Sequence, residues 1–290
     1  MTGIFLIDKE QGWTSSDVVA RLRRVLGERR IGHAGTLDPL ATGLLIVMVG
    51  RATRASDYLM KHDKRYLAHL RLGIETDTQD ITGQVIREKP CRVSPEEVKA
   101  AAERFLGTVQ QMPPMYSAIK VRGRKLYEIA RRGETVERKA RTITISSLSI
   151  AGMQDTDYIL DISCSSGTYV RTLCHDIGQT LGCGGCMTQL RRLASGCFTV
   201  DRAHTVEEIS KADRKTIDSW IIPTDKAFSQ FEELTVNDEA EKKLRCGTAV
   251  AQCAADGKYR VYSTDGTFLM LGYTENGILR TEKSFFEVNR

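Results

Sequence analysis

The chain has 290 residues, of which 27% are charged and 41% hydrophobic, a balance typical of a globular protein that needs no disulfides or metal ions to stabilise its core. No apolar stretch approaches the roughly 20 residues of a membrane-spanning helix, and no secretory signal is recognisable at the N-terminus. We therefore expect a cytoplasmic protein without membrane association. The net charge of +5 indicates an acidic partner only if the positive residues are concentrated in one region.

The eight cysteines are expected to be reduced, because the chain has no secretory signal. Cys183 and Cys186 have the spacing of a zinc-ligand pair. A structural zinc site needs four ligands, however, and no second pair with such spacing follows. We therefore expect no metal site.

The first 30 residues are interpreted as scaffold. Residues 3–7 are apolar and predict a strand. Thr14 and Asp17 then have the character of a helix start, and the apolar residues that follow recur at helical spacing.

Asp38 is the most distinctive candidate for a catalytic residue. It precedes Pro39 and a six-residue apolar run, residues 44–49, that predicts a buried strand. The proline biases Asp38 towards an extended backbone. Glycines in the surrounding loop allow a ligand to approach the main chain closely; they are Gly32, Gly35 and Gly43. An ordinary turn before a core strand is the alternative interpretation.

The next segments predict scaffold elements. Residues 51–60 indicate a helix, and residues 64–72 alternate as a strand with Tyr66 on the apolar face. A tyrosine in such a position is typically a core residue. Ser94 begins a further helix, with Pro95 in the first turn.

Residues 120–141 concentrate the positive charge. Nine Lys and Arg stand there against three Glu, a net charge of +6 that exceeds the excess of the whole chain. Charged runs are often solvated surface. The loop-like residues 112–116 before it and the glycines Gly123 and Gly133 instead favour a basic excursion that binds a nucleic-acid backbone without reading its sequence.

Two strands, residues 141–150 and 158–164, lead to a helix predicted at residues 172–181. If the chain before this helix is extended, Tyr169 and Arg171 point the same way. A cation is unfavourable at the positive end of a helix dipole. Arg171 is therefore either a surface residue or the partner of a specific anion, for which Asp38 is a candidate.

The last third predicts a passage between two domains and then a small module. Residues 206–228 are polar and rich in turns. A short helix at residues 235–245 and three short strands joined by Asp-Gly and Asn-Gly turns follow. We therefore expect one domain at residues 1–230, with a basic insertion at 113–142, and a β-rich domain at 231–290.

Several of these residues together resemble the TruB family of pseudouridine synthases. The matching segments occur in the family's order: 32–43, 63–66, 72–73 with 76–78, 113–118 and 166–171. The resemblance runs from about residue 3 to residue 203, and its Gly-His-x-Gly-x-Leu-Asp-Pro block is highly specific. It implies an α+β catalytic domain with a mainly antiparallel sheet, and residues 231–290 are similar in character to the PUA-like RNA-binding domain of many members.

The resemblance also implies a function. Members of the family isomerise one uridine in the T arm of tRNA, position 55, to pseudouridine, without a cofactor or a metal. Asp38 matches the catalytic aspartate, which attacks either uracil C6 or ribose C1′. Arg171 matches the arginine that pairs with it, and Tyr66 matches the tyrosine that stacks on the base and removes the C5 proton.

Further residues match the family's substrate-binding positions. His33 matches the residue that packs into the space left by the flipped base, and Tyr169 and Leu190 match other pocket residues. Arg54 stands where many members have a lysine near the substrate. The basic excursion matches the loop that clamps the T arm. Lys9-Glu10 departs from the family's Lys-Pro, which bears on the turn after the first strand but on none of these residues.

Two other functions stay open at this level. One is a guide-dependent synthase of the archaeal and eukaryotic branch, and the other is a non-catalytic RNA-folding or RNA-binding module. Intact Asp38, Tyr66 and Arg171 argue against lost catalysis. We expect a monomer that acts on tRNA and requires no protein partner.

Overall fold

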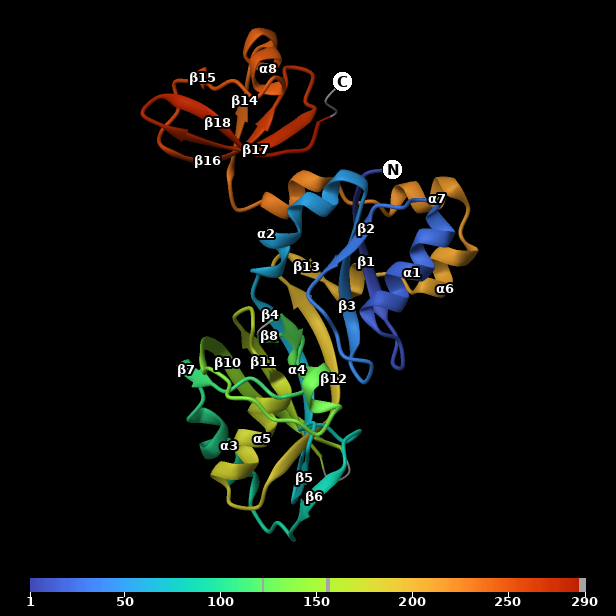
Figure 1. Ribbon diagram of the computed structural model, residues 1–290, viewed down its shortest axis with the longest axis vertical. Coiled ribbons are helices and arrows are strands. Elements are labelled where there is room, and N and C mark those ends of the chain that lie inside the picture. The colour runs from blue at the N-terminus through green and yellow to red at the C-terminus, as the bar shows by residue number, and fades with distance from the viewer. Residues whose placement is uncertain (122, 155–156, 287–290) are drawn as a thin grey trace.

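A computed structural model describes residues 1–121, 123–154 and 157–286. The basic residue Arg122 and the last four residues of the expected C-terminal domain lie outside this part of the chain. The molecule is elongated, with a large sheet through most of its length and a smaller sheet at one end (Figure 1). No helix within the described ranges is long and apolar enough to span a membrane.

The large sheet has nine strands, and seven of them follow the order β1-β3-β12-β4-β11-β10-β7. Strand β2 pairs with β3, and β13 pairs with β12. All pairs are antiparallel except β3 with β12, so the expected mainly antiparallel sheet is confirmed. The bounds are β1 (Gly3–Lys9), β2 (Ile31–Ala34), β3 (Thr42–Val49), β4 (Lys64–Leu72), β7 (Gly107–Gln111), β10 (Arg141–Gln154), β11 (Asp157–Cys164), β12 (Gly185–Ser195) and β13 (Phe198–Thr199).

Helices bury one face of this sheet. Apolar residues of the helices and of the sheet form one core cluster, which includes Leu22, Tyr66 and Ile177. Strands β1 and β3 are buried on their second face too, against a cluster that contains Leu59 and Phe228. Burial on both faces explains the continuous apolar run of β3. The helices on the first face are α1 (Ser15–Leu26), α3 (Pro95–Glu103), α5 (Val170–Thr180), α6 (Val206–Lys211) and α7 (Arg214–Ser219).

The helix starts predicted at Thr14 and Ser94 are confirmed. Thr14 and Ser94 each form a capping box with the acidic residue three positions later, which satisfies backbone N–H groups of the first turn. The helix expected at residues 51–60 is a 3-10 helix, η1 (Gly50–Ala55), followed by α2 (Ser56–Met60).

The interpretation of residues 206–228 as a passage between domains is wrong. They form α6, α7 and the 3-10 helix η3 (Thr224–Phe228), and they bury Ile209, Ile217 and Phe228 in the two core clusters. The helices are short, so each shows too few apolar residues for a helical period to be recognised.

A second, five-stranded sheet follows, as expected. Its order is β14-β16-β17-β18-β15, and it encloses a separate core cluster around Val261 and Leu279. Asn276 and Gly277 both have positive φ, 54° and 72°, which suits the tight turn between β17 and β18. The elements are β14 (Glu232–Thr235), α8 (Asp238–Arg245), β15 (Val250–Ala251), β16 (Gly257–Tyr262), β17 (Phe268–Glu275) and β18 (Ile278–Ser284).

Two small hairpins extend from the large sheet. The first pairs β5 (Ile74–Thr76) with β6 (Val85–Glu88). The second, in the basic segment, pairs β8 (Lys120–Val121) with β9 (Arg124–Lys125) and continues into α4 (Leu126–Ala130). Helix α4 is anchored by the buried Leu126.

One cysteine prediction is wrong. Cys91 and Cys183 form a disulfide across 92 residues of sequence, with their Cα atoms 5.5 Å apart. The other six cysteines are free. Cys183 is thus not a zinc ligand with Cys186, and the described residues contain no cluster of three or more potential metal ligands. The disulfide joins the segment after β6 to the turn between α5 and β12.

We expect iodoacetamide to label only the six free cysteines of the denatured, unreduced protein, and all eight after reduction. Intact-mass spectrometry measures the difference. Cys91→Ser should lower the free energy of unfolding by about 2–4 kcal/mol, because the disulfide restricts the unfolded chain. Cys246→Ser, which removes an exposed free thiol, is the control. Labelling of all eight without reductant contradicts the disulfide.

Candidate active site

The loop between β2 and β3 carries Asp38 and is held by the N-terminal segment. Ser15, the first residue of α1, accepts from the Leu37 N–H (2.9 Å) and donates to the Leu37 carbonyl (3.2 Å). Gly12 donates to the Pro39 carbonyl (2.8 Å). Gly32 lies within β2 and Gly43 within β3. The loop that carries Asp38 is therefore shorter than the stretch between these glycines that the sequence predicted.

Arg171 pairs with Asp38, as its unfavourable place in the sequence indicated. Its Nε lies 3.1 Å from Asp38 Oδ2, and Arg171 is only 6% exposed. The alternative of a surface arginine is therefore wrong. Tyr169 is extended, but α5 begins at Val170 and Arg171 is its second residue, so the strand-like alternation that would point Tyr169 and Arg171 the same way does not extend to Arg171. The buried helix start points the guanidinium into the site.

Asp80 is a site residue that sequence reasoning missed. It lies in the turn between β5 and β6, is 4% exposed, and its Oδ2 lies 3.3 Å from Arg171 Nη1. Arg171 also donates to the carbonyls of Thr78 (3.1 Å) and Tyr116 (2.8 Å). One guanidinium therefore connects two carboxylates and two loops. The neighbouring residues 76–78, which match the family, were the one feature of the sequence that indicated a functional role for this turn.

The pKa of Asp38 reflects opposing effects. Burial of the carboxylate raises its pKa above the usual 3.8, Arg171 lowers it, Asp80 raises it and Lys9 lowers it. The side chain is still 39% exposed, so the carboxylate is crowded by the protein on one side and open on the other. This opening gives a substrate access to an oxygen that Arg171 holds in place.

Lys9 is a second residue whose importance the sequence did not show. It is fully buried and donates to the carbonyls of Trp13 (2.7 Å) and Glu10 (3.0 Å). Burial lowers its pKa to about 8, and the charge of Asp38 opposes this change. Lys9 stabilises the turn after β1, where the family's proline is replaced by Glu10.

Tyr66 and Leu190 are brought together by the sheet. Tyr66 lies in β4 between β11 and β12, and Leu190 lies in β12; each is 8% exposed and part of the same core cluster. Burial raises the pKa of the Tyr66 hydroxyl, and Arg192 on β12 lowers it. The charge of Asp38 also raises this pKa, by the smallest of these effects.

His33 and Tyr169 border the same region. His33 is half-buried in β2, and burial together with the charge of Arg192 lowers its pKa. Tyr169 precedes α5, where the side-chain amide of Gln111 accepts from its N–H (2.8 Å) and donates to its carbonyl (3.0 Å). These backbone contacts fix the start of α5 and therefore the position of Arg171.

Arg54 is not brought to this group of residues. It donates to the backbone carbonyl and the hydroxyl of Ser284, both at 2.8 Å, at the end of β18. Lys283 in turn donates to the Arg54 carbonyl. Its contacts thus join η1 to the C-terminal sheet, and none reaches Asp38.

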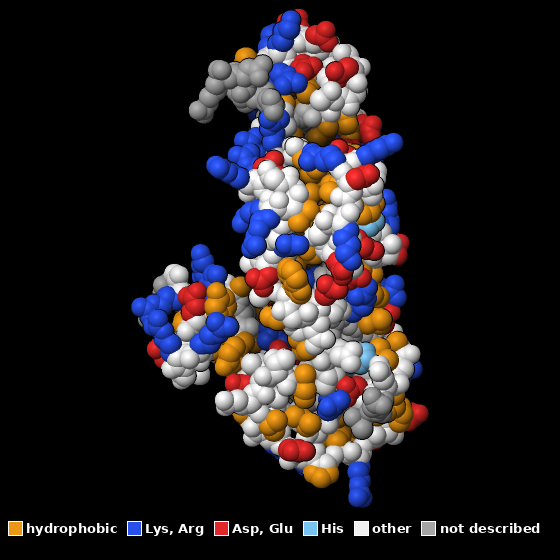
Figure 2. All heavy atoms as spheres, turned by 90° about the vertical axis from the view of Figure 1, so that its right-hand side faces the viewer, with side chains coloured by type: hydrophobic (Ala, Val, Ile, Leu, Met, Phe, Trp, Pro, Cys, Tyr) orange, Lys and Arg blue, Asp and Glu red, His pale blue; other side chains and the backbone are white. Residues whose placement is uncertain are grey.

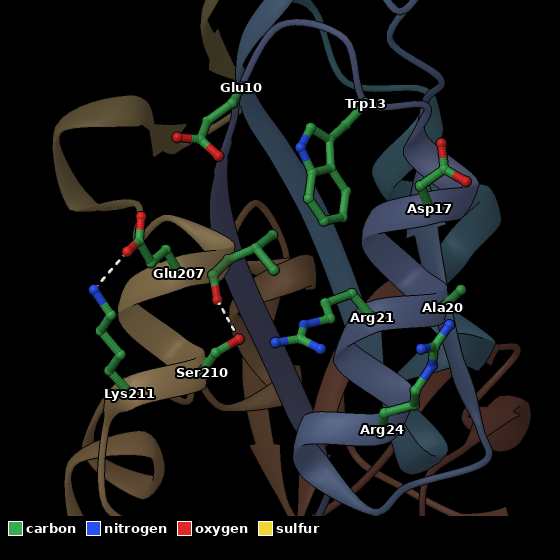
Figure 3. Close-up of a pocket in the computed structure, with 10 residues that line it drawn as sticks. Glu10, Trp13, Asp17, Ala20, Arg21, Arg24, Glu207, Ser210 and Lys211 are labelled. Carbon is green, nitrogen blue, oxygen red and sulfur yellow. Dashed lines mark hydrogen bonds and ion pairs between the residues drawn. The ribbon is translucent and has the colours of Figure 1, made fainter.

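A groove of about 760 Å³ between α1 and α6 is a separate feature. Figure 3 shows Trp13 and Arg21 beside it, with the Glu207–Lys211 ion pair on the other side. None of the site residues named above lines this groove. The candidate active site is therefore the region around the ion pair of Asp38 with Arg171, outside this groove.

Comparisons with known proteins show which family the chain is similar to. The model of the TruB family pseudouridylate synthase N-terminal domain matches residues 23–170, and that of the tRNA pseudouridylate synthase B C-terminal domain matches residues 171–229. tRNA pseudouridine synthase B of Clostridium perfringens is 42% identical over 99% of this chain and 100% of its own length. The protein of that name from Burkholderia lata is 40% identical over 98% of this chain and 90% of its own length.

Solved structures show the same fold. A chain in a Cbf5-Nop10-Gar1 complex has a TM-score of 0.77 at 24% identity, covering 99% of this chain and 86% of its own. A chain in an H/ACA RNP bound to a substrate RNA has a TM-score of 0.75 at 22% identity, with the same coverage. These likenesses confirm the expected α+β fold. With the matches of sequence, they establish that the chain belongs to the TruB family of pseudouridylate synthases.

Proposed function

We propose that the protein converts one uridine in the T arm of tRNA, position 55, to pseudouridine, with Asp38 as the nucleophile. The ion pair of the partly exposed Asp38 with the buried Arg171 is the observation that carries this proposal. The family membership and relatives named tRNA pseudouridine synthase B support the substrate. The expected location in the cytoplasm fits a tRNA substrate.

The reaction exchanges one glycosidic bond for another. Asp38 attacks the nucleotide at uracil C6 or ribose C1′, the N1–C1′ bond breaks, the base turns, the C5–C1′ bond forms, and the bond to Asp38 breaks again to release the carboxylate. The C5 proton leaves and N1 gains a proton, so no atom or electron is gained or lost overall. Arg171 supports the attack because its charge favours the ionised carboxylate.

The other residues receive and hold the flipped base. Tyr66 offers an aromatic ring for stacking and a hydroxyl for removal of the C5 proton, and Leu190 and Tyr169 complete the pocket. Extrusion of a base costs a few kcal/mol in lost stacking and pairing. His33 offsets part of this cost by packing into the vacated space. Arg54 contacts an RNA phosphate from η1, next to the C-terminal sheet.

The basic segment 113–142 clamps the T arm in this proposal. The described Lys and Arg side chains of its hairpin and following loop are mostly exposed. Figure 2 shows such side chains on a lobe that projects at the height where Figure 1 shows β8 and α4. Exposed cations on a protruding element bind phosphates by releasing counterions.

Residues 1–230 form the catalytic domain in this proposal, and residues 231–290 form a PUA-like RNA-binding domain. The separate core cluster of the second sheet supports this division. The protein acts as a monomer without a protein partner. Relatives at 40–42% identity support a stand-alone tRNA enzyme, whereas the similar chains from H/ACA complexes support the fold alone. Activity of the purified protein on transcribed tRNA, without other proteins, distinguishes a stand-alone enzyme from a guide-dependent synthase.

Asp38→Asn should reduce the single-turnover rate at least about a thousandfold, as loss of a nucleophile does, and leave tRNA affinity largely intact. Carbodiimide mapping of the product RNA measures pseudouridine. Asp161→Asn, which removes a carboxylate paired with the exposed Arg65 on β4, is the matched control. Retained turnover in Asp38→Asn contradicts the nucleophile assignment.

Replacing Lys120, Arg124, Arg132 and Lys139 by Gln should weaken tRNA binding and flatten its salt dependence. The slope of log affinity against log salt should fall by about one for each phosphate that the variant no longer neutralises. Filter binding at several salt concentrations measures the slope. The control variant carries Gln at Lys99 and Arg214, which both lie in ion pairs on helix surfaces. An equal salt slope in the control and in the variant of the basic segment would show that this segment is ordinary surface.

Arg171→Met should move the acid limb of the activity profile to higher pH and lower the rate. The guanidinium lowers the pKa of Asp38, so its loss raises that pKa, and a larger fraction of Asp38 is protonated at any given acidic pH. Single-turnover rates across pH measure the limb. Arg65→Met removes an exposed arginine and should leave the acid limb at its wild-type pH. An unmoved limb in Arg171→Met contradicts electrostatic control of Asp38 by Arg171.

A further inference from the structure

Arg192 is a buried cation that the proposed mechanism does not use. It is 2% exposed and is the largest fully buried side chain in the described part of the chain. Its Nε donates to the Leu44 carbonyl at 2.6 Å and its Nη2 to the Gly35 carbonyl at 3.2 Å. Gly35 precedes Asp38 and Leu44 follows it. The guanidinium therefore closes the base of the loop that carries Asp38.

The backbone of this loop is shaped to reach Arg192. Gly35 has φ +85°, and a Cβ there would lie 3.4 Å from Arg192 Nη1. Gly43 has φ +92°, and a Cβ there would lie 2.4 Å from the Arg192 carbonyl oxygen. A side chain at either position would be strained by the positive φ, and one at Gly43 would also clash with the Arg192 backbone. The two glycines thus allow the two ends of the loop to pack against the same residue.

Arg192 differs from Arg171 in how its charge is satisfied. The buried Arg171 pairs with Asp38 and Asp80, whereas Arg192 forms no ion pair with any described residue and is satisfied by backbone carbonyls. Burial of a cation without a counter-charge is costly. Apolar packing would fill the same space at lower cost, so a guanidinium at this position indicates a functional requirement.

Arg192 also faces the residue that stacks on the base. It lies opposite Tyr66 in the pairing of β12 with β4. Its charge lowers the pKa of the Tyr66 hydroxyl, against the effect of burial. The same side chain therefore contacts the loop of Asp38 on one side and Tyr66 on the other.

We propose that Arg192 is a positioning residue, which fixes the Asp38 loop and the Tyr66 side chain relative to each other before the RNA binds. The proposal rests on the proposed function. Because Arg192 is almost fully enclosed, it acts through these two groups and does not touch the substrate. A lysine should not replace it, since Arg192 uses two different nitrogens of its planar guanidinium for the Leu44 and Gly35 carbonyls, a geometry that an ammonium does not have.

The test compares Arg192→Met and Arg192→Lys with Arg191→Met. Arg191 is the neighbouring residue of β12, but it pairs with Asp8 at 2.7 Å. Both Arg192 variants should lower the single-turnover rate about a hundredfold, the scale expected for misplaced reacting groups, while the Kd for tRNA changes less than about threefold. Arg191→Met should keep the wild-type rate. Wild-type turnover in Arg192→Met overturns the proposal.

Two further measurements distinguish positioning from mere folding. Added guanidinium ion should restore part of the rate of Arg192→Ala, well below denaturing concentrations, and leave Arg191→Ala unchanged. Gly35→Ala, which disturbs the same hydrogen bond, should slow the reaction and add little to the effect of Arg192→Met. Absence of rescue together with additive effects overturns the proposal. A wild-type protein without activity contradicts the proposed function as well, whereas normal Arg192→Met turnover contradicts only this inference.

Discussion

The buried guanidinium of Arg171 is the constraint on which the site depends. A cation that is 6% exposed requires partners, since an unpaired buried charge is strongly destabilising. Its partners come from three segments: the loop before β3, the turn between β5 and β6, and the loop that contains Tyr116. Asp38 therefore reaches its place beside Arg171 only when distant parts of the chain have folded together.

The charges around Arg171 leave Asp38 incompletely neutralised. Asp38 and Asp80 share one guanidinium, so each receives only part of its attraction. Lys9 adds a second, buried positive charge nearby. Asp80 is enclosed by the protein, whereas Asp38 is 39% exposed. The more enclosed carboxylate thus holds the arginine, and the open one is available for chemistry.

The features that the sequence predicted correctly are those that local interactions determine. Capping at Thr14 and the alternation around Tyr66 gave the correct helix and strand, because their signals lie within a few residues. The disulfide of Cys91 with Cys183 and the place of Asp80 were missed, since both depend on segments that meet only in the tertiary structure. The pairing of Asp38 with Arg171 was expected because a cation at a helix start has a local electrostatic cost.

Strand register explains why the sheet itself is part of the site. The pairing of β12 with β4 shifts between Met187 and Gln189 and again between Arg192 and Ala194. The segment between these shifts carries Leu190 and Arg192, both buried. Irregularities of this kind redirect side chains, and a slip of one residue would move a whole strand segment to the opposite face. The two shifts therefore give the segment with Leu190 and Arg192 a register of its own with β4, displaced by one residue from the pairing on either side.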